Sequence, residues 1–367
     1  MKTIEVQLAS SAYPVYLGPG LLSDSSLWQA HLGSGKTLIV SNDVVAPLYL
    51  EPLVSGLESR QAEIHIIPDG EPYKTCDTWS GIIDKLVNMK ARRDVNVIAL
   101  GGGVVGDISG YAAASYMRGV RFLQVPTTLL AQVDASVGGK TGFNHEKGKN
   151  LVGAFHQPAA VMIDSGTLET LPEREYRAGL AEVVKYGAIR DRSFFDWLEN
   201  NAAAISQREI GALDDLIHRS VSNKAEVVAA DEKEAGVRAL LNFGHSFGHA
   251  LEAETDYSEF LHGEAVSIGM VIAAKLSESR GLCDAGAADR ISSLLEQFEL
   301  PVSLPPNTSM DGLLEALSLD KKAIASGLRL VLLRSIGNAV VDDESTLEEI
   351  IRILQLSLGH QRTSAKE

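Results

Sequence analysis

The sequence feature that most restricts the fold is an apolar, strand-like run that leads directly into a glycine run. Residues 95–100 read Val-Asn-Val-Ile-Ala-Leu, and residues 101–107 read Gly-Gly-Gly-Val-Val-Gly-Asp. Short β-branched runs also occupy 36–40 and 63–67, and apolar residues recur at helical spacing over 78–90. This alternation predicts an α/β domain with a mostly parallel, Rossmann-like sheet, which binds ligands at the carboxyl ends of its strands.

The glycine run from Gly101 to Gly106 satisfies the spacing G-x-G-x-x-G between a predicted strand and a predicted helix. Glycines let the backbone approach a pyrophosphate, and the start of the helix favours its negative charge. The acidic residue usual about twenty positions later is absent, because residues 122–128 read Phe-Leu-Gln-Val-Pro-Thr-Thr. We interpret the run as a dinucleotide cradle in which Asn42 or Glu71 supplies ribose contacts. A tight turn without a ligand is the alternative.

A second glycine-rich loop lies at 134–141, Asp-Ala-Ser-Val-Gly-Gly-Lys-Thr. It is not a phosphate-binding P-loop, because Asp134 occupies the position of the first required glycine. The loop belongs to a basic cluster that also includes Arg118, Lys147 and Lys149. We interpret Lys147 as a solvated surface lysine.

Composition excludes several classes of protein. A formal net charge of −15 over 367 residues argues against nucleic-acid binding and against acidic membrane surfaces. No apolar run approaches the length of a membrane span, and residues 1–8 alternate like a strand, unlike a signal peptide. The two cysteines, Cys76 and Cys283, form no disulfide framework. The cytoplasm is therefore the expected compartment.

The pattern changes near residue 171, where helix periodicity begins to dominate. We predict an α/β domain over 1–171 and a helical domain over 172–358, with a short strand at 328–333. Residues 359–367 are predicted to form a flexible tail.

Three of the nine histidines lie close together in the second half. His245 and His249 have the i, i+4 spacing that projects two imidazoles from one helix face, and His262 follows in His-Gly-Glu. Such a group favours a divalent transition metal. A zincin protease is excluded because Ser246 occupies the place of its catalytic glutamate. The alternative is a pair of core histidines and an unrelated surface histidine.

Glu182 and Lys185 lie at i, i+3 in the small, apolar helical segment 178–187. A charged pair on such a face is costly unless it has a further partner, so a metal ion or an anion is a natural one. A surface ion pair is the alternative.

Taken in order, these motifs resemble the 3-dehydroquinate synthase family. The matching segments are 68–74, 101–107, 115–120, 126–141, 148–150, 179–187, 224–231, 241–249, 262–264 and 320–322. The resemblance implies a nucleotide-binding α/β domain followed by an all-α metal-binding domain, with the active site in the cleft between them.

By matching position, the resemblance implies that Glu182, His245 and His262 bind one divalent metal ion, zinc by preference and cobalt as the alternative. His249 then lies beside the substrate as a polar or proton-handling group, which replaces the ligand role suggested by its spacing. The implied NAD contacts are Asn42, Glu71, Lys74, Gly102, Gly103, Asp107, Thr127, Thr128, Lys140 and Lys149.

The implied substrate is a seven-carbon sugar acid phosphate, whose carboxylate and phosphate require cationic partners. The residues expected at the reacting substrate are Asp134, Lys140, Asn150, Lys185, Lys224, Arg238, Asn242 and one of Lys321 and Lys322. Arg118 matches an arginine that reaches the neighbouring subunit's active site, which implies a functional homodimer.

The resemblance also implies the reaction. NAD oxidises a substrate hydroxyl transiently, phosphate is eliminated, the hydride returns, and an intramolecular aldol step closes the ring. Three alternatives remain from the sequence: a polyol or alcohol dehydrogenase, a related sugar phosphate cyclase, and a non-catalytic metal- or nucleotide-binding protein. The cation cluster disfavours the first, because a dehydrogenase has no need of it.

Overall fold

The chain forms two compact units. The computed structural model describes residues 1–9, 11–58, 62–234, 236–318 and 328–359, so the prediction for Lys321 and Lys322 lies outside the described residues. The first unit contains Met1–Pro172 and Arg208–Lys233, and the second contains Glu173–Gln207 and the chain from 234 onward. This division differs from the contiguous boundary at 171 expected from the sequence, because one long helix returns to the first unit.

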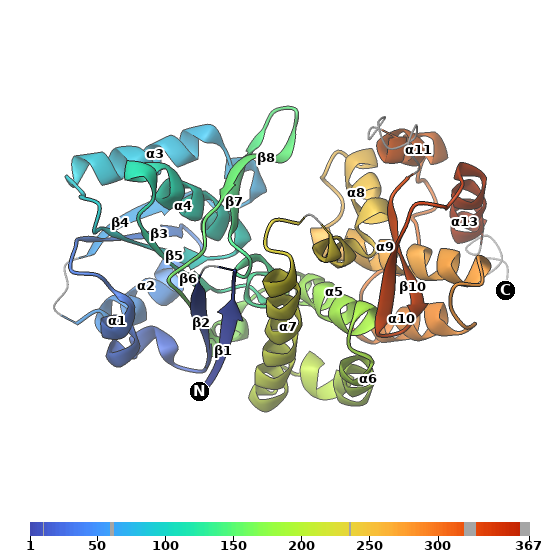
Figure 1. Ribbon diagram of the computed structural model, residues 1–367, viewed down its shortest axis with the longest axis horizontal. Coiled ribbons are helices and arrows are strands. Elements are labelled where there is room, and N and C mark those ends of the chain that lie inside the picture. Colours follow the sequence, from blue (N-terminus) through green and yellow to red (C-terminus); the bar gives the residue numbers. More distant parts are fainter. Residues whose placement is uncertain (10, 59–61, 235, 319–327, 360–367) are drawn as a thin grey trace. The chain divides into compact units, whose positions relative to one another are not determined.

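A seven-stranded sheet organises the first unit (Figure 1), with the strand order β1-β2-β9-β6-β5-β3-β4. All neighbouring strands pair in parallel except β1 and β2, which are antiparallel. The mostly parallel sheet predicted from the sequence is therefore confirmed. The strands are β1 Lys2–Gln7, β2 Ala12–Gly18, β3 Thr37–Asn42, β4 Ala62–Ile67, β5 Asn96–Gly101, β6 Arg121–Pro126 and β9 Ala160–Asp164.

Helices cover both faces of this sheet, which is why every residue of β3 and β5 is buried. One apolar cluster joins Ile82 and Ile108 to one face, and another joins Trp28 and Leu53 to the opposite face. The indole Nε1 of Trp28 donates to the carbonyl of Leu22 at 2.9 Å, so its polar atom is satisfied in the core. The helices are α1 Ser25–His31, α2 Ala46–Gly56, α3 Cys76–Asn88 and α4 Gly103–Ser115.

Three further pieces complete the first unit. The strands β7 (Lys140–His145) and β8 (Gly148–Phe155) pair as an antiparallel ribbon, drawn in green in Figure 1. Helix α7 (Ile210–Ala230) packs against β1, and Lys2 Nζ lies 2.5 Å from Asp215 Oδ1 across that contact. A one-turn π-helix, η4, spans Ala131–Ala135 and also contacts α7.

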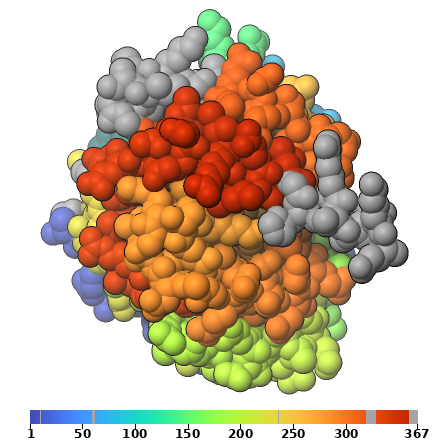
Figure 2. All heavy atoms as spheres, turned by 90° about the vertical axis from the view of Figure 1, so that its right-hand side faces the viewer, coloured from blue at the N-terminus to red at the C-terminus, as the bar shows by residue number. Residues whose placement is uncertain are grey.

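Among its described residues, the second unit is helical apart from one hairpin. Its core helix is α9, in which every residue from Ala265 to Ala274 is buried. Figure 2 shows the red C-terminal elements lying over the orange part of this unit, and α13 packs on α9. The elements are α5 Glu173–Ile189, α6 Arg192–Ser206, η6 Val237–Asn242, α8 His245–Glu254, α9 His262–Ser279, α10 Ala287–Gln297, α11 Met310–Ser318, β10 Leu330–Ser335, β11 Asn338–Asp342 and α13 Leu347–Gly359.

The C-terminus differs slightly from expectation, because Gly359 ends α13 and does not begin a tail. The rest of the predicted tail, 360–367, lies outside the described residues. Within the part of the chain that is described, no helix combines the length and the apolar character that a membrane span requires.

Candidate active site

Three side chains in the second unit form a compact group of potential metal ligands. Glu182 projects from α5, while His245 and His262 are the first residues of α8 and α9. One nitrogen or oxygen from each side chain lies within 4.8 Å of the other two. The Nε2 atoms of the two histidines lie 3.4 and 3.6 Å from Glu182 Oε1. The sequence resemblance predicts this same trio.

The contacts of the two Nδ1 atoms show how the imidazoles of His245 and His262 are oriented. His245 Nδ1 lies 3.2 Å from the carbonyl oxygen of Phe243, and His262 Nδ1 lies 3.2 Å from Glu252 Oε2. A carbonyl and an ionised carboxylate can only accept, so each Nδ1 carries a proton and donates it. When the histidines are neutral, both Nε2 lone pairs then face the oxygen of Glu182. Lone pairs that converge in this way need a cation, and two nitrogens with one oxygen suit zinc.

The electrostatics of the group lead to the same conclusion. Burial opposes ionisation of Glu182, but the charge of Lys185 and the two histidines hold its pKa well below the usual range. Burial and the charge of Lys185 lower the pKa of His245. Burial also disfavours the charged form of His262, yet the carboxylates of Glu182 and Glu252 beside its two ring nitrogens raise its pKa to about 9. Without a metal, His262 is therefore protonated, and its positive charge replaces the charge that a metal ion would supply.

Lys185 and His249 lie next to these ligands. The ammonium of Lys185 forms an ion pair with Glu182, and both side chains are buried, so the surface ion pair that was the alternative is wrong. The exposed His249 has its ring centroid 5.4 Å from that of His245 and 5.6 Å from that of His262. The buried carboxylate of Glu252 was not predicted from the sequence. Its position at i+7 from His245, on the same helix face, is the signal that could have found it.

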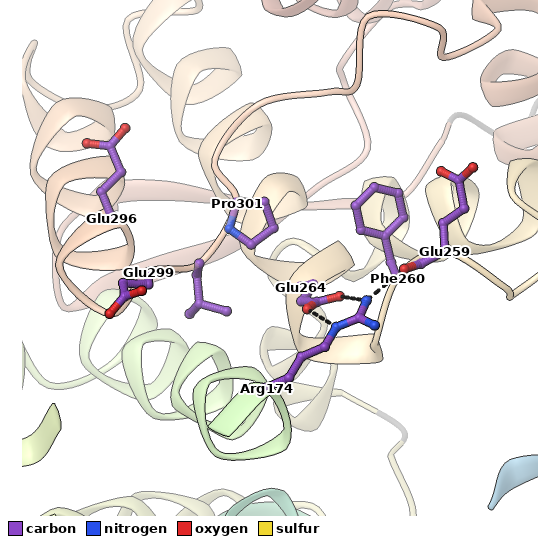
Figure 3. Close-up of a pocket in the computed structure, with 8 residues that line it drawn as sticks. Arg174, Glu259, Phe260, Glu264, Glu296, Glu299 and Pro301 are labelled. Atoms are coloured by element: carbon purple, nitrogen blue, oxygen red, sulfur yellow. Dashed lines mark hydrogen bonds and ion pairs between the residues drawn. The ribbon is translucent and has the colours of Figure 1, made fainter. Parts of the chain in front are cut away.

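The start of α9, which carries His262, is held by a separate clamp (Figure 3). Arg174 donates from Nε and Nη2 to the two carboxylate oxygens of Glu264, at 2.7 and 2.8 Å. Glu264 Oε2 also accepts the backbone N–H of Leu261 at 2.8 Å. Arg174 and Glu264 line a surface cavity of about 540 Å³ together with Glu259, Phe260, Glu296, Glu299, Leu300 and Pro301. The cavity contains none of the three potential metal ligands.

In the first unit, several predicted NAD contacts lie where the parallel strands end. Asn42 is the last residue of β3, Gly102 joins β5 to α4, and Gly103 is the first residue of α4. A Cβ atom on Gly102 would lie 3.0 Å from Thr128 Cγ2, so the backbone approaches this neighbour closely. After β6, the hydroxyl of Thr127 is buried and has no hydrogen-bond partner among the described residues. A ligand with a polar group would satisfy it.

A buried lysine links the strand ends to the ribbon. Lys74 Nζ lies 2.6 Å from Asp107 Oδ2 and donates to Asn150 Oδ1 at 2.7 Å. Burial raises the pKa of Asp107, and the nearby charge of Lys74 opposes that rise. Asn144 was not predicted from the sequence: its Nδ2 donates to Glu71 Oε1 at 2.7 Å, and its Oδ1 accepts the backbone N–H of Asn150 at 2.9 Å. Asn144 therefore holds Glu71, a predicted NAD contact, and Asn150, a predicted substrate contact.

A second ion pair lies within the first unit. Lys224 on α7 approaches Asp134 in η4, with Nζ 2.9 Å from Oδ1 and 2.6 Å from the backbone carbonyl oxygen. The lysine is 5% exposed, so this charge is largely removed from water. Residues ninety positions apart meet here because α7 returns to the first unit.

The remaining predicted residues differ in exposure. Arg118 is exposed in the left-handed backbone region, with φ 67°. Lys140 and Asn242 are exposed, Lys149 is half-buried, and Arg238 is buried in η6. The roles of these five residues stay predictions.

Comparison with known proteins identifies relatives along nearly the whole chain. Residues 64–178 match the family described as 3-dehydroquinate synthase N-terminal, and residues 179–323 match 3-dehydroquinate synthase C-terminal. A 3-dehydroquinate synthase of Halorhodospira halophila is 54% identical, over 95% of this chain and 98% of its own length. The 3-dehydroquinate synthase of Methylococcus capsulatus is 52% identical, over 93% of this chain and 95% of its own length.

Among solved structures, a 2-epi-5-epi-valiolone synthase of Streptomyces hygroscopicus with NAD⁺ and Zn²⁺ bound superposes with a TM-score of 0.87. It is 34% identical, and the match covers 96% of this chain and 98% of that one. A parallel-sheet unit together with a helical unit is thus the fold of the sugar phosphate cyclases, an enzyme class. Within that class, the chain belongs to the 3-dehydroquinate synthase family.

Proposed function

We propose that the chain converts 3-deoxy-D-arabino-heptulosonate 7-phosphate to 3-dehydroquinate and phosphate, with NAD and one divalent metal ion as cofactors. The identity of 54% to a 3-dehydroquinate synthase over 95% of the chain carries the proposal. A different sugar phosphate cyclase is less well supported, because the valiolone synthase is only 34% identical.

We assign metal binding to Glu182, His245 and His262, supported by the convergence of their ligand atoms within 4.8 Å. A divalent ion bound there supplies Lewis acidity toward substrate oxygens. Because each histidine carries its proton on Nδ1, its Nε2 lone pair faces the position assigned to the ion. Lys185 holds Glu182 in its ionised form, because the ammonium and the carboxylate form a buried ion pair. Zinc is the preferred ion, and cobalt is the alternative.

We assign NAD binding to the carboxyl ends of the strands in the first unit. NAD supplies a hydride acceptor that returns the hydride within the same cycle, so no cofactor is consumed. The glycines at the start of α4 leave room for the pyrophosphate, and the helix N-terminus favours its charge. Lys74 and Asp107 form an ion pair at one side of α4, and the buried hydroxyl of Thr127 supplies a hydrogen bond. The full assigned set is Asn42, Glu71, Lys74, Gly102, Gly103, Asp107, Thr127, Thr128, Lys140 and Lys149.

We assign recognition of the sugar acid phosphate to polar and cationic side chains. Lys185 and Lys224 are both nearly fully buried, so their charges act with little screening by water. Asp134 orients Lys224 through the ion pair of 2.9 Å. We assign to the exposed imidazole of His249 the exchange of a proton with the substrate. The other assigned residues are Lys140, Asn150, Arg238 and Asn242.

We further propose that the enzyme is a homodimer in which Arg118 completes the active site of the neighbouring subunit. The exposure of Arg118 supports this role, because an exposed guanidinium is accessible to a neighbouring subunit. The two free cysteines, Cys76 and Cys283, are consistent with the cytoplasm as its compartment.

The activity is tested by incubating the protein with the heptulosonate phosphate, with and without added NAD and zinc. We expect phosphate release that depends on both additions, while the absorbance of NADH stays flat. A substrate deuterated at the carbon that is oxidised should yield dehydroquinate that retains the label. Stoichiometric accumulation of NADH would instead establish a dehydrogenase, and cofactor binding without turnover would establish a non-catalytic protein.

A further inference from the structure

Glu252 lies beside the proposed metal ligands without being one of them. We propose that Glu252 is a positioning residue, which fixes the tautomer and orientation of His262 and thereby sets the metal affinity of the site. This inference rests on the proposed metal-binding role of Glu182, His245 and His262. It concerns a residue for which neither the motifs nor the resemblance supplies a role.

The two nitrogens of His262 face two different carboxylates. Nδ1 lies 3.2 Å from Glu252 Oε2, and Nε2 lies 3.6 Å from Glu182 Oε1. Since the two nitrogens point away from each other, the carboxylates hold the ring from two sides. Glu252 is only 4% exposed, so its carboxylate cannot turn into water without disrupting the packing of α8.

This contact decides which nitrogen of His262 is available to a metal. The carboxylate of Glu252 can only accept, so it keeps the proton of the neutral imidazole on Nδ1. The lone pair on Nε2 then points toward Glu182, where the ion would bind. Without an acceptor at Nδ1, the proton can move to Nε2 and occupy the metal-binding position.

The corresponding acceptor for His245 is the backbone carbonyl of Phe243, which no side-chain substitution removes. Of these two Nδ1 acceptors, Glu252 is therefore the one that a side-chain substitution can remove. It reaches His262 from a neighbouring helix: Glu252 is on α8, and His262 opens α9. Substitution of a side chain that hydrogen-bonds a metal ligand typically changes metal affinity by roughly 10- to 100-fold.

Glu252 has one competing interpretation. Ligand atoms of His249, Glu252 and His262 also lie within 4.8 Å of one another. Glu252 would then be a direct ligand of a second ion. The contact between Glu252 and His262 Nδ1 favours the positioning role, because the same His262 already directs Nε2 toward Glu182.

The test compares Glu252→Met and Glu252→Gln with the parent protein. Methionine keeps the length of the side chain and removes the acceptor. A glutamine amide can either accept from Nδ1 or donate to it, so it allows both tautomers. Glu254→Gln is the matched control, because Glu254 is on the same helix and its Oε1 accepts from the Ser309 N–H at 2.9 Å. Zinc affinity is measured by competition with a chromophoric chelator, alongside thermal unfolding and the zinc content per chain.

We expect zinc to bind about 10- to 100-fold more weakly to Glu252→Met, with a smaller loss in Glu252→Gln and none in the control. The visible spectrum of the cobalt-substituted Met variant should show the parent's number of ligands. Zinc affinity within twofold of the parent in the Met variant would overturn the proposal, as would two zinc ions per parent chain. If the Met variant does not fold, the Gln variant decides, and the parent's affinity there overturns the proposal.

His262→Ala separates this inference from the function on which it rests. Loss of zinc in His262→Ala together with unchanged affinity in the Glu252 variants would reject only the positioning role. Unchanged zinc affinity in His262→Ala would reject the metal assignment itself.

Discussion

Arg174 donates to both carboxylate oxygens of Glu264, and Glu264 in turn accepts the backbone N–H of Leu261 at the start of α9. The side chain of Arg174 is 60% exposed, so its ion pair is screened by water. We expect Arg174→Ala to lower the free energy of unfolding by less than about 1 kcal/mol. Glu264→Ala also removes the acceptor of the Leu261 N–H at the start of α9 and should cost about 1–2 kcal/mol. Urea unfolding of both variants checks this order, and an equal cost would contradict the capping role.

The metal assignment predicts different outcomes for neighbouring histidines. Removing one of three protein ligands leaves an open, poorly shaped site, so His245→Ala and Glu182→Ala should lose both the bound ion and the activity. His249→Ala should retain the ion and lose rate. Elemental analysis of the purified variants checks this. Retention of the metal by His262→Ala together with its loss from His249→Ala would show that the ligands are assigned wrongly.

The raised pKa of His262, about 9 against an ordinary 6.5, predicts that zinc binding depends on pH. Near pH 7 the metal-free site holds a proton that zinc must displace, so affinity should fall as pH falls below 9. Calorimetry in two buffers with different ionisation heats should detect release of about one proton per zinc near pH 7. Binding without proton release would contradict this.

The raised pKa of His262 also determines how the stability of the folded protein changes with pH. Because the pKa is raised in the folded, metal-free protein, the contribution of His262 is fully present below pH 6.5 and is lost as pH rises through 9. In His262→Gln this part of the pH dependence should disappear. Denaturant midpoints measured across that range, in the presence of a chelator, make the comparison.

Two glycines near the start of α4 provide a matched pair for the NAD site. A Cβ atom on Gly103 would lie 3.5 Å from Ala135 Cβ, an ordinary contact, whereas one on Gly106 would lie 2.9 Å from Gln124 Oε1. We expect Gly103→Ala to keep the parent's stability but to bind NAD at least about tenfold more weakly, because the methyl group occupies space needed by the pyrophosphate. Gly106→Ala should lose stability only to the extent that the buried amide of Gln124 cannot move aside. Thermal unfolding and NAD titration separate the two effects, and NAD affinity equal to the parent's in Gly103→Ala would place the pyrophosphate elsewhere.

A shared active site predicts complementation between two inactive variants. When Arg118→Ala and Lys140→Ala subunits are refolded together, each heterodimer has one site with both lesions and one with neither. Random pairing then leaves about a quarter of all sites intact. Phosphate release should rise well above that of either variant alone. No recovery from heterodimers shown to have formed would place Arg118 in its own subunit's site.

The alternation of strands and helices in the first half was predictable because a parallel sheet is buried on both faces. The apolar run at 95–100 becomes β5, Asn96–Gly101, and the helix predicted over 78–90 becomes α3, Cys76–Asn88. The return of α7 to the first unit was not predictable. Its amphipathic pattern shows that one face is buried but does not identify the surface that buries it.

The contacts in the candidate active site also divide into those that the sequence predicts and those that it does not. Glu182 and Lys185 could be paired from their spacing on one helix, and the structure confirms the ion pair. The contacts of Glu252 with His262 and of Asn144 with Glu71 join residues on different elements. Local periodicity contains no information about such contacts, so they required the tertiary structure.

The path of the chain also determines the order in which the protein can be completed during synthesis. The chain crosses between the units at 172/173, 207/208 and 233/234, so α5 and α6 must be made before α7 can cover β1 and bring Lys224 to Asp134. The nascent first unit therefore exposes the face of β1 until part of the second unit has left the ribosome. For the same reason, exchanging one unit between two relatives requires three junctions, because a single cut at 172 leaves α7 with the wrong partner.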